Sequence, residues 1–72
     1  GLFTIEMNSD KNIIADLSIR NLMGKTFWTE KNIRLNGRSL KTLDLNNLID
    51  GVYFVYLECN EGLVIKKITI LH

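Results

Sequence analysis

The sequence is poor in the residues that make cross-links and metal sites. Its 72 residues include no proline, one cysteine and one histidine. Cys59 has no second cysteine with which to form a disulfide, and one cysteine with one histidine is too few for a structural zinc site. We therefore expect no metal and no other cofactor. The fold has to be stabilised by the packing of apolar side chains.

The sequence has almost no excess of charge of either sign. It contains nine Lys and Arg residues and eight Asp and Glu residues, which leaves a net charge of +1. A protein that binds nucleic acid needs a concentrated positive surface, so we expect no nucleic-acid partner. Apolar runs such as residues 51–57 are far shorter than the roughly 20 residues that cross a bilayer. The sequence therefore predicts no transmembrane segment, and its first residues do not resemble a signal peptide.

Catalytic motifs are missing too. The sequence has no nucleophile elbow, no paired carboxylates placed for a cleft and no glycine-rich phosphate loop after a strand. Its histidine, His72, is the last residue. A chain of this length forms one domain with a small core, which leaves little room for a buried active site. We expect a domain without enzymatic activity.

The sequence does contain segments in which apolar and polar residues alternate. In residues 13–20, apolar and polar side chains alternate with the period of two that is typical of a half-buried strand, and similar patterns occur in residues 2–7 and 43–45. Turn-forming residues recur about every eight to twelve positions. The sequence predicts a single all-β domain over residues 1–72, an immunoglobulin-like antiparallel β-sandwich of about six to seven strands. The side chains expected in its core are Ile5, Leu17, Ile19, Phe27, Leu45, Leu48, Tyr53 and Val55.

The turns have specific signatures. Residues 8–12 and the pair Asn36-Gly37 predict two hairpin turns, the second joining residues 31–35 to residues 39–45. In residues 21–25, Gly24 can adopt a left-handed backbone before Lys25 leads into the next strand. The spacing of Leu48, Gly51 and Tyr53 is typical of a tyrosine corner, in which a tyrosine hydroxyl bonds to upstream backbone, and it favours a crossover between two sheets.

Two further features admit more than one interpretation. Trp28 and Tyr56 are the one aromatic pair that can face outward without emptying the core, which leaves a carbohydrate-binding surface as an alternative. Lys66 and Lys67 are neighbours in the last predicted strand, so their side chains point to opposite faces. They either protect an edge strand from unwanted pairing or present a charged edge for recognition.

Five short segments occur in a characteristic order: residues 1–5 (GLFTI), 17–25 (LSIRNLMGK), 43–48 (LDLNNL), 51–55 (GVYFV) and 66–68 (KKI). In this order and spacing the chain resembles the C-terminal sorting domain of cargo proteins of the type IX (Por) secretion system of Bacteroidetes. The resemblance implies a domain that directs a larger secreted protein across the periplasm to the cell surface. It implies as partners the outer-membrane translocon and a sortase-like cysteine peptidase that removes the domain.

The resemblance also assigns roles to residues. It points to Lys66, Lys67 and Ile68 as translocon-recognition residues, and to Gly24, Lys25, Leu48, Gly51 and Tyr53 as a structural motif. The family usually has a further strand, with a Pro-Asn-Pro-like stretch, before the segment that matches residues 1–5. We therefore expect a bare edge beside Phe3 and Ile5, and an edge-strand dimer of the isolated chain. A carbohydrate-binding or fibronectin-like spacer module of an extracellular enzyme is the alternative function.

Overall fold

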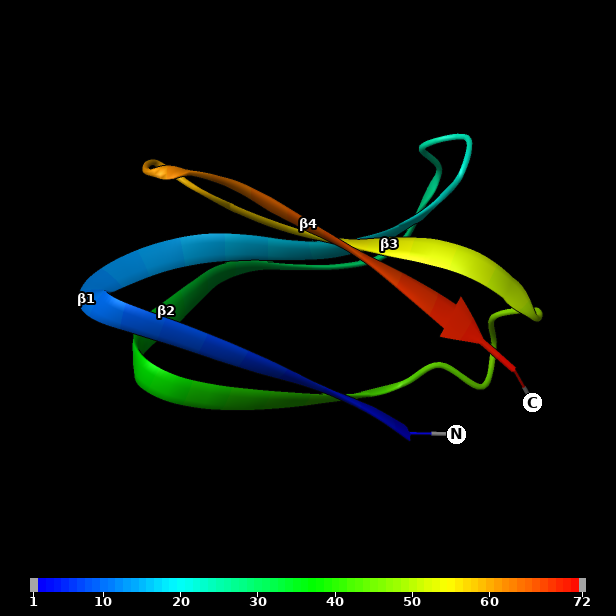
Figure 1. Ribbon diagram of the computed structural model, residues 1–72, viewed down its shortest axis with the longest axis horizontal. Helices are drawn as coiled ribbons and strands as arrows, with labels where there is room; N and C mark the ends of the chain where they lie inside the picture. Colours follow the sequence, from blue (N-terminus) through cyan, green and yellow to red (C-terminus); the bar gives the residue numbers. More distant parts are fainter. Residues whose placement is uncertain (1, 72) are drawn as a thin grey trace.

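The computed structural model describes residues 2–71 as four antiparallel strands in one sheet (Figure 1). Gly1 and His72 lie outside the described residues. The strands are β1 (Leu2–Asn21), β2 (Thr26–Asp44), β3 (Gly51–Cys59) and β4 (Gly62–Ile70), and their order in the sheet is β2-β1-β3-β4. Residues 2–71 contain no helix that could cross a membrane. The prediction of an all-β antiparallel fold is confirmed.

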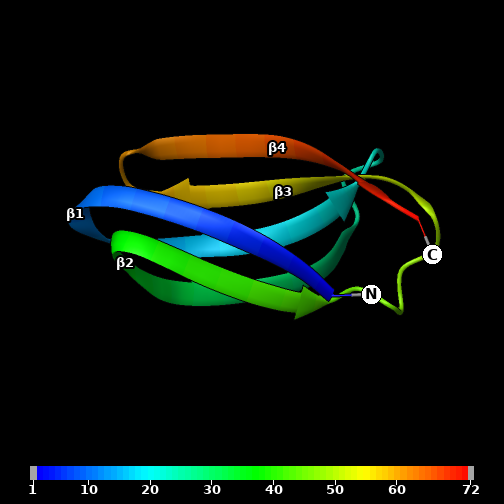
Figure 2. The same ribbon diagram turned by 60° about the horizontal axis from the view of Figure 1, so that its bottom comes forward.

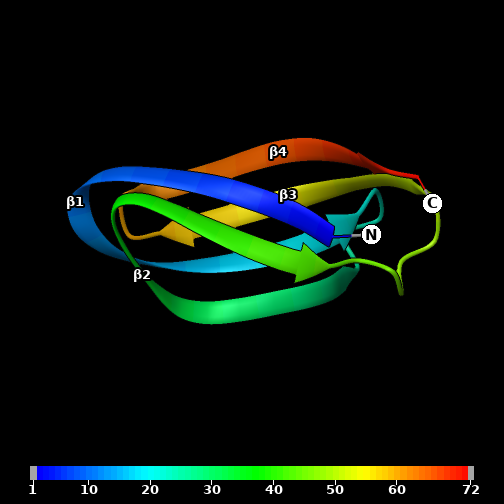
Figure 3. The same ribbon diagram turned by 90° about the horizontal axis from the view of Figure 1, so that it is seen from below.

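The first two strands form a long ribbon that folds over the rest of the sheet. β1 and β2, of 20 and 19 residues, pair from Leu2↔Asp44 to Arg20↔Thr26. β3 pairs only with residues 15–21 of β1, and β4 pairs with β3. Residues 2–9 of β1 and 37–44 of β2 therefore extend beyond the four-stranded part and lie across one of its faces (Figures 2 and 3). The apolar core lies between these two layers.

The ribbon bends where the sequence predicts two hairpin turns. The register changes from Ser9↔Gly37 to Ile13↔Leu35, so residues 10–12 of β1 lie opposite a single residue of β2. Ser9 Oγ accepts a hydrogen bond from the Lys11 amide and donates one to the Lys11 carbonyl, and Gly37 has a φ of 76°. Because the two turn-prone segments face each other across the ribbon, they bend both strands together instead of reversing either one.

The predictions of hairpins at residues 8–12 and at Asn36-Gly37 are thus wrong. Each bend joins two predicted strands into one, which is why the structure has four strands where about six to seven were expected. Turn-forming residues do lie at both positions, but there they bend the chain instead of reversing it.

The predicted connection at residues 21–25 is present and joins β1 to β2. The Asn21 side-chain oxygen accepts hydrogen bonds from the amides of Met23 (3.0 Å) and Lys25 (2.9 Å), and Gly24 has a φ of 84°. The left-handed glycine and the Asn21 side chain together satisfy the polar groups of a tight loop.

The core follows the predicted alternation with one clear exception. Leu17, Ile19, Leu45, Tyr53 and Val55 are buried as expected, while Ile5 and Leu48 are half-buried against the same cluster. Phe27 was expected in the core but is 41% exposed. An extra β2 residue opposite Asp16, between Ala15↔Ile33 and Leu17↔Glu30, turns Trp28 inward, and Phe27 is the unpaired residue of a second β-bulge between Ile19↔Trp28 and Arg20↔Thr26.

Candidate functional site

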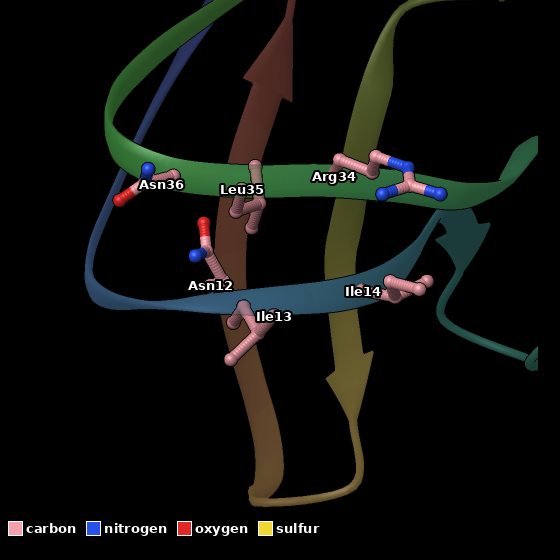
Figure 4. A pocket seen from close by; sticks show the side chains of 6 residues that line it. All are labelled: Asn12, Ile13, Ile14, Arg34, Leu35 and Asn36. Atoms are coloured by element: carbon pink, nitrogen blue, oxygen red, sulfur yellow. The ribbon is translucent and has the colours of Figure 1, made fainter.

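Catalytic geometry is not found in the part of the chain that the structure describes. Within residues 2–71, no three His, Cys, Asp or Glu side chains lie close enough to hold a metal ion. Cys59 is half-buried and free. An open depression of about 380 Å³ lies at the bend of the ribbon, and Figure 4 shows its lining: Asn12, Ile13 and Ile14 from β1 with Arg34, Leu35 and Asn36 from β2. This lining holds two amides, one guanidinium and apolar groups, and it has no nucleophile with an adjacent base.

The three predicted recognition residues lie together on β4, which is an edge strand. β4 pairs only with β3 within residues 2–71, so every other residue directs its backbone N–H and C=O groups away from the sheet. The register places Lys66 opposite Val55, Lys67 opposite Phe54 and Ile68 opposite Tyr53. Because Val55 and Tyr53 are buried, Lys66 and Ile68 lie on the core-facing side of β4 and Lys67 on the outer side.

Lys66 is solvent-exposed although it lies on the core-facing side, because a groove opens beside it. The groove has a volume of about 200 Å³ and separates β4 from the amino-terminal part of β1. Its apolar lining comes from Ile5, Met7, Leu17, Val55, Leu57 and Val64, and Lys66, Glu6 and Asn8 complete it. The site thus combines a free strand edge, an apolar floor and one cation.

The positive charge on β4 is not neutralised by the carboxylates of residues 2–71. The ion pairs in this range are Lys11–Glu61, Arg20–Glu58, Arg38–Glu6 and Lys41–Glu30. Glu6 lines the groove, but its carboxylate is held by Arg38. Lys66 and Lys67 therefore present two ammonium groups, one on each face of the same edge strand.

Three residues of the predicted structural motif meet at the crossover from β2 to β3. The Tyr53 hydroxyl donates a 2.7 Å hydrogen bond to the carbonyl of Ile49, four residues upstream, which is the geometry of a tyrosine corner. The Leu48 amide donates to the carbonyl of Leu45 at 3.0 Å, and the Leu48 side chain packs against the core. Gly51 begins β3, and a Cβ there would lie 3.9 Å from the Tyr53 ring.

Lys25 contacts this crossover through Phe27, while Gly24 shapes the loop before it with a φ of 84°. The Lys25 ammonium lies 5.1 Å from the centre of the Phe27 ring, and the Phe27 ring meets the Tyr53 ring edge-on with centroids 5.8 Å apart. The loop at residues 21–25 and the crossover at residues 45–50 are thus packed together by aromatic contacts at one end of the domain.

Trp28 and Tyr56 do not form the aromatic surface that the alternative, carbohydrate-binding interpretation requires. Trp28 pairs with Ile19 and packs against the core, whereas Tyr56 pairs with Ser18 on the outer face of the sheet. The Tyr56 ring is also covered by the Arg20 guanidinium, which lies 4.1 Å from the ring centre. Trp28 and Tyr56 therefore lie on opposite faces, because β2 has an extra residue opposite Asp16, between the pairs Ala15↔Ile33 and Leu17↔Glu30, which turns Trp28 inward.

Sequence reasoning missed the groove and the Arg20–Tyr56 contact. Met7 and Val64 line the groove from segments more than 50 residues apart, and the ribbon has to bend before they approach each other. No local pattern in the sequence marks this groove, because its lining comes from β1, β3 and β4.

Comparison with known proteins agrees with the order of the sequence motifs. A family model described as the secretion system C-terminal sorting domain matches residues 1–71. Searches of curated proteins and of solved structures returned no significant match. Because the family match spans nearly the whole chain, this protein belongs to the C-terminal sorting domains of the type IX secretion system.

Proposed function

We propose that this domain is the non-catalytic export signal of a larger cargo protein and that the type IX translocon recognises it at β4. Membership of the family implies a sorting signal that interacts with the type IX machinery and leads to the cell surface or to secretion. The proposal adds which element the translocon recognises, namely Lys66, Lys67 and Ile68 of β4.

One observation carries this proposal: two adjacent lysines without a carboxylate partner in residues 2–71 occupy an edge strand whose backbone is free on one side. Backbone groups at a free edge bind an added strand, and charges on both faces select its sequence. Ile68 packs against the core and anchors this strand to the domain.

The test is export of a secreted reporter that carries the domain at its carboxyl terminus. We expect Lys66→Glu with Lys67→Glu to abolish surface display, because reversing charges at a recognition edge weakens binding while exposed substitutions change stability by about 0.5 kcal/mol or less. The matched control is Lys31→Glu with Arg34→Glu, which makes the same charge change on the exposed residues of β2. Circular dichroism of the isolated variants verifies folding. Normal display of the folded β4 variant would contradict the proposal.

We also propose the export route. The cargo crosses the periplasm before it reaches the translocon, and a sortase-like cysteine peptidase then removes the domain at the cell surface. The bent ribbon lying over the rest of the sheet supports an immunoglobulin-like sandwich as the architecture of the domain in the complete cargo. A carbohydrate-binding function loses its support because Trp28 and Tyr56 lie on opposite faces.

A further inference from the structure

We propose that β4 binds an extended strand with two adjacent acidic residues, and that apolar side chains of this strand fill the groove beside Lys66. The identity of the partner as a component of the export machinery rests on the proposed function. The binding chemistry itself follows from the edge, the groove and the charges.

The β4 edge is suited to strand addition. Its pairing with β3 runs without interruption from Gly51↔Ile70 to Cys59↔Gly62, so β4 contains no bulge. The other outer strand, β2, has register shifts along its pairing with β1. Bulges discourage pairing at an edge. β4 is therefore the more regular of the two outer strands.

The groove determines which side chains the added strand needs. In a strand beside β4, alternate side chains lie next to Val64, Lys66 and Ile68, on the side of the groove. Val64 is 51% exposed on this side, although it shares its face with buried Val55. A dry cavity of about 150 Å³ holds a benzene-sized group. A groove of about 200 Å³ therefore takes one or two apolar side chains of a partner.

The two lysines determine the charge. Adjacent residues of the added strand point to opposite faces, so an acidic pair places one carboxylate beside Lys66 in the groove and the other beside Lys67 outside it. A second copy of this chain does not supply such a strand, because no two of its eight Asp and Glu residues are adjacent. The charge complementarity thus favours a different protein as the partner.

The test uses the 72-residue chain and a synthetic peptide, acetyl-Thr-Val-Glu-Asp-Thr-Val-Thr-amide, which alternates apolar and polar residues around an acidic pair. Titration followed by nuclear magnetic resonance gives the dissociation constant and the residues affected. We expect changes in β4 and the groove, and about tenfold or greater weakening when the acidic pair is replaced by two lysines. Replacing both valines by serine, or methylating alternate backbone amides of the peptide, should also abolish binding.

A charge exchange separates specific pairing from general attraction. The variant Lys66→Glu with Lys67→Glu should reject the acidic peptide and bind the lysine peptide, whereas Lys31→Glu with Arg34→Glu should behave like the unchanged chain. Equal affinity for both peptides, tight binding of the methylated peptide, or changes confined to β2 would overturn the proposal. Peptide binding that follows these rules, together with normal export of the β4 variant, would uphold this inference and refute the proposed function.

Discussion

The hydroxyl of Tyr53 donates a 2.7 Å hydrogen bond to the carbonyl of Ile49, and this bond fixes the crossover that carries the chain from β2 to β3. Tyr53 is 4% exposed. Loss of the hydroxyl leaves a partly buried carbonyl without this donor. We expect Tyr53→Phe to lower the free energy of unfolding by about 1 kcal/mol or more.

Thermal or urea unfolding measures this change. The control is Tyr56→Phe, because the Tyr56 ring stacks on Arg20 and its hydroxyl makes no hydrogen bond within residues 2–71. An unchanged stability of Tyr53→Phe would show that the crossover does not depend on this bond.

Leu17 is fully buried where both layers meet, and it belongs to the larger core cluster. We expect Leu17→Ala to cost about 2–5 kcal/mol through lost burial and the cavity that remains. For a domain of this size that loss is most of the total stability, so the variant should be largely unfolded at 37 °C. Ile14→Ala, at a residue exposed on the same strand, should change stability by about 0.5 kcal/mol or less. Similar melting temperatures for the two variants would contradict the assigned faces.

Gly37 lies at the bend of β2 with a φ of 76°, and a Cβ at this position meets no atom within 4 Å. Substitution there tests backbone strain without a steric clash. We expect Gly37→Ala to destabilise the domain by about 1 kcal/mol, and Gly37→Asn to cost less because asparagine tolerates a left-handed backbone. Urea unfolding of both variants measures the difference, and an alanine variant as stable as the unchanged chain would show that the bend does not need a positive φ.

Within residues 2–71, the amino-terminal part of β1 is paired only on the side of β2, because β3 pairs with residues 15–21. We expect the isolated chain to form a dimer through residues 2–8, since this segment has no lysine, proline or bulge to prevent pairing. Sedimentation equilibrium should show association that Thr4→Lys shifts toward the monomer.

Thr42→Lys is the matched control for that experiment. The Thr4 and Thr42 hydroxyls share a 3.2 Å hydrogen bond, so both variants lose the same contact, but the second places its lysine on β2. A monomer at all concentrations would refute the dimer, and a greater effect of Thr42→Lys would assign it to the edge of β2.

Sequence reasoning succeeded where alternation was uninterrupted. In β1, the inward positions of Ala15, Leu17 and Ile19 follow from period two alone and are correct. It failed at Phe27, because β2 has an extra residue opposite Asp16, so its inward positions pass from Ile33 to Glu30 and Trp28. A period of two in one segment cannot show this shift, since the extra residue is defined by how β2 pairs with β1.

The turn at Asn36-Gly37 illustrates a different limit. The left-handed preference of Gly37 was predictable, and the structure has it. Whether such a residue reverses a strand or bends a ribbon depends on what lies opposite, which is residues 10–12 of β1. The proposed recognition residues Lys66 and Lys67 were predicted from the sequence, whereas the groove beside Lys66 depends on that bend and is visible only in three dimensions.

The continuity of the β1–β2 ribbon also bears on how the domain folds. Its pairing starts beside the short loop at residues 21–25 and extends, through three register shifts, to Leu2 and Asp44. Each new residue pair forms next to an existing pair, so the entropic cost of loop closure per step is low. We therefore expect the pairing of β1 and β2 to extend outward from the loop at residues 21–25. The hairpin of β3 and β4 forms in the same local way, and docking of β3 onto β1 is then the main long-range step. A domain built from two locally paired units, β1–β2 and β3–β4, can refold quickly after it has been held unfolded. In this sequence of events the pair Leu2↔Asp44 forms last.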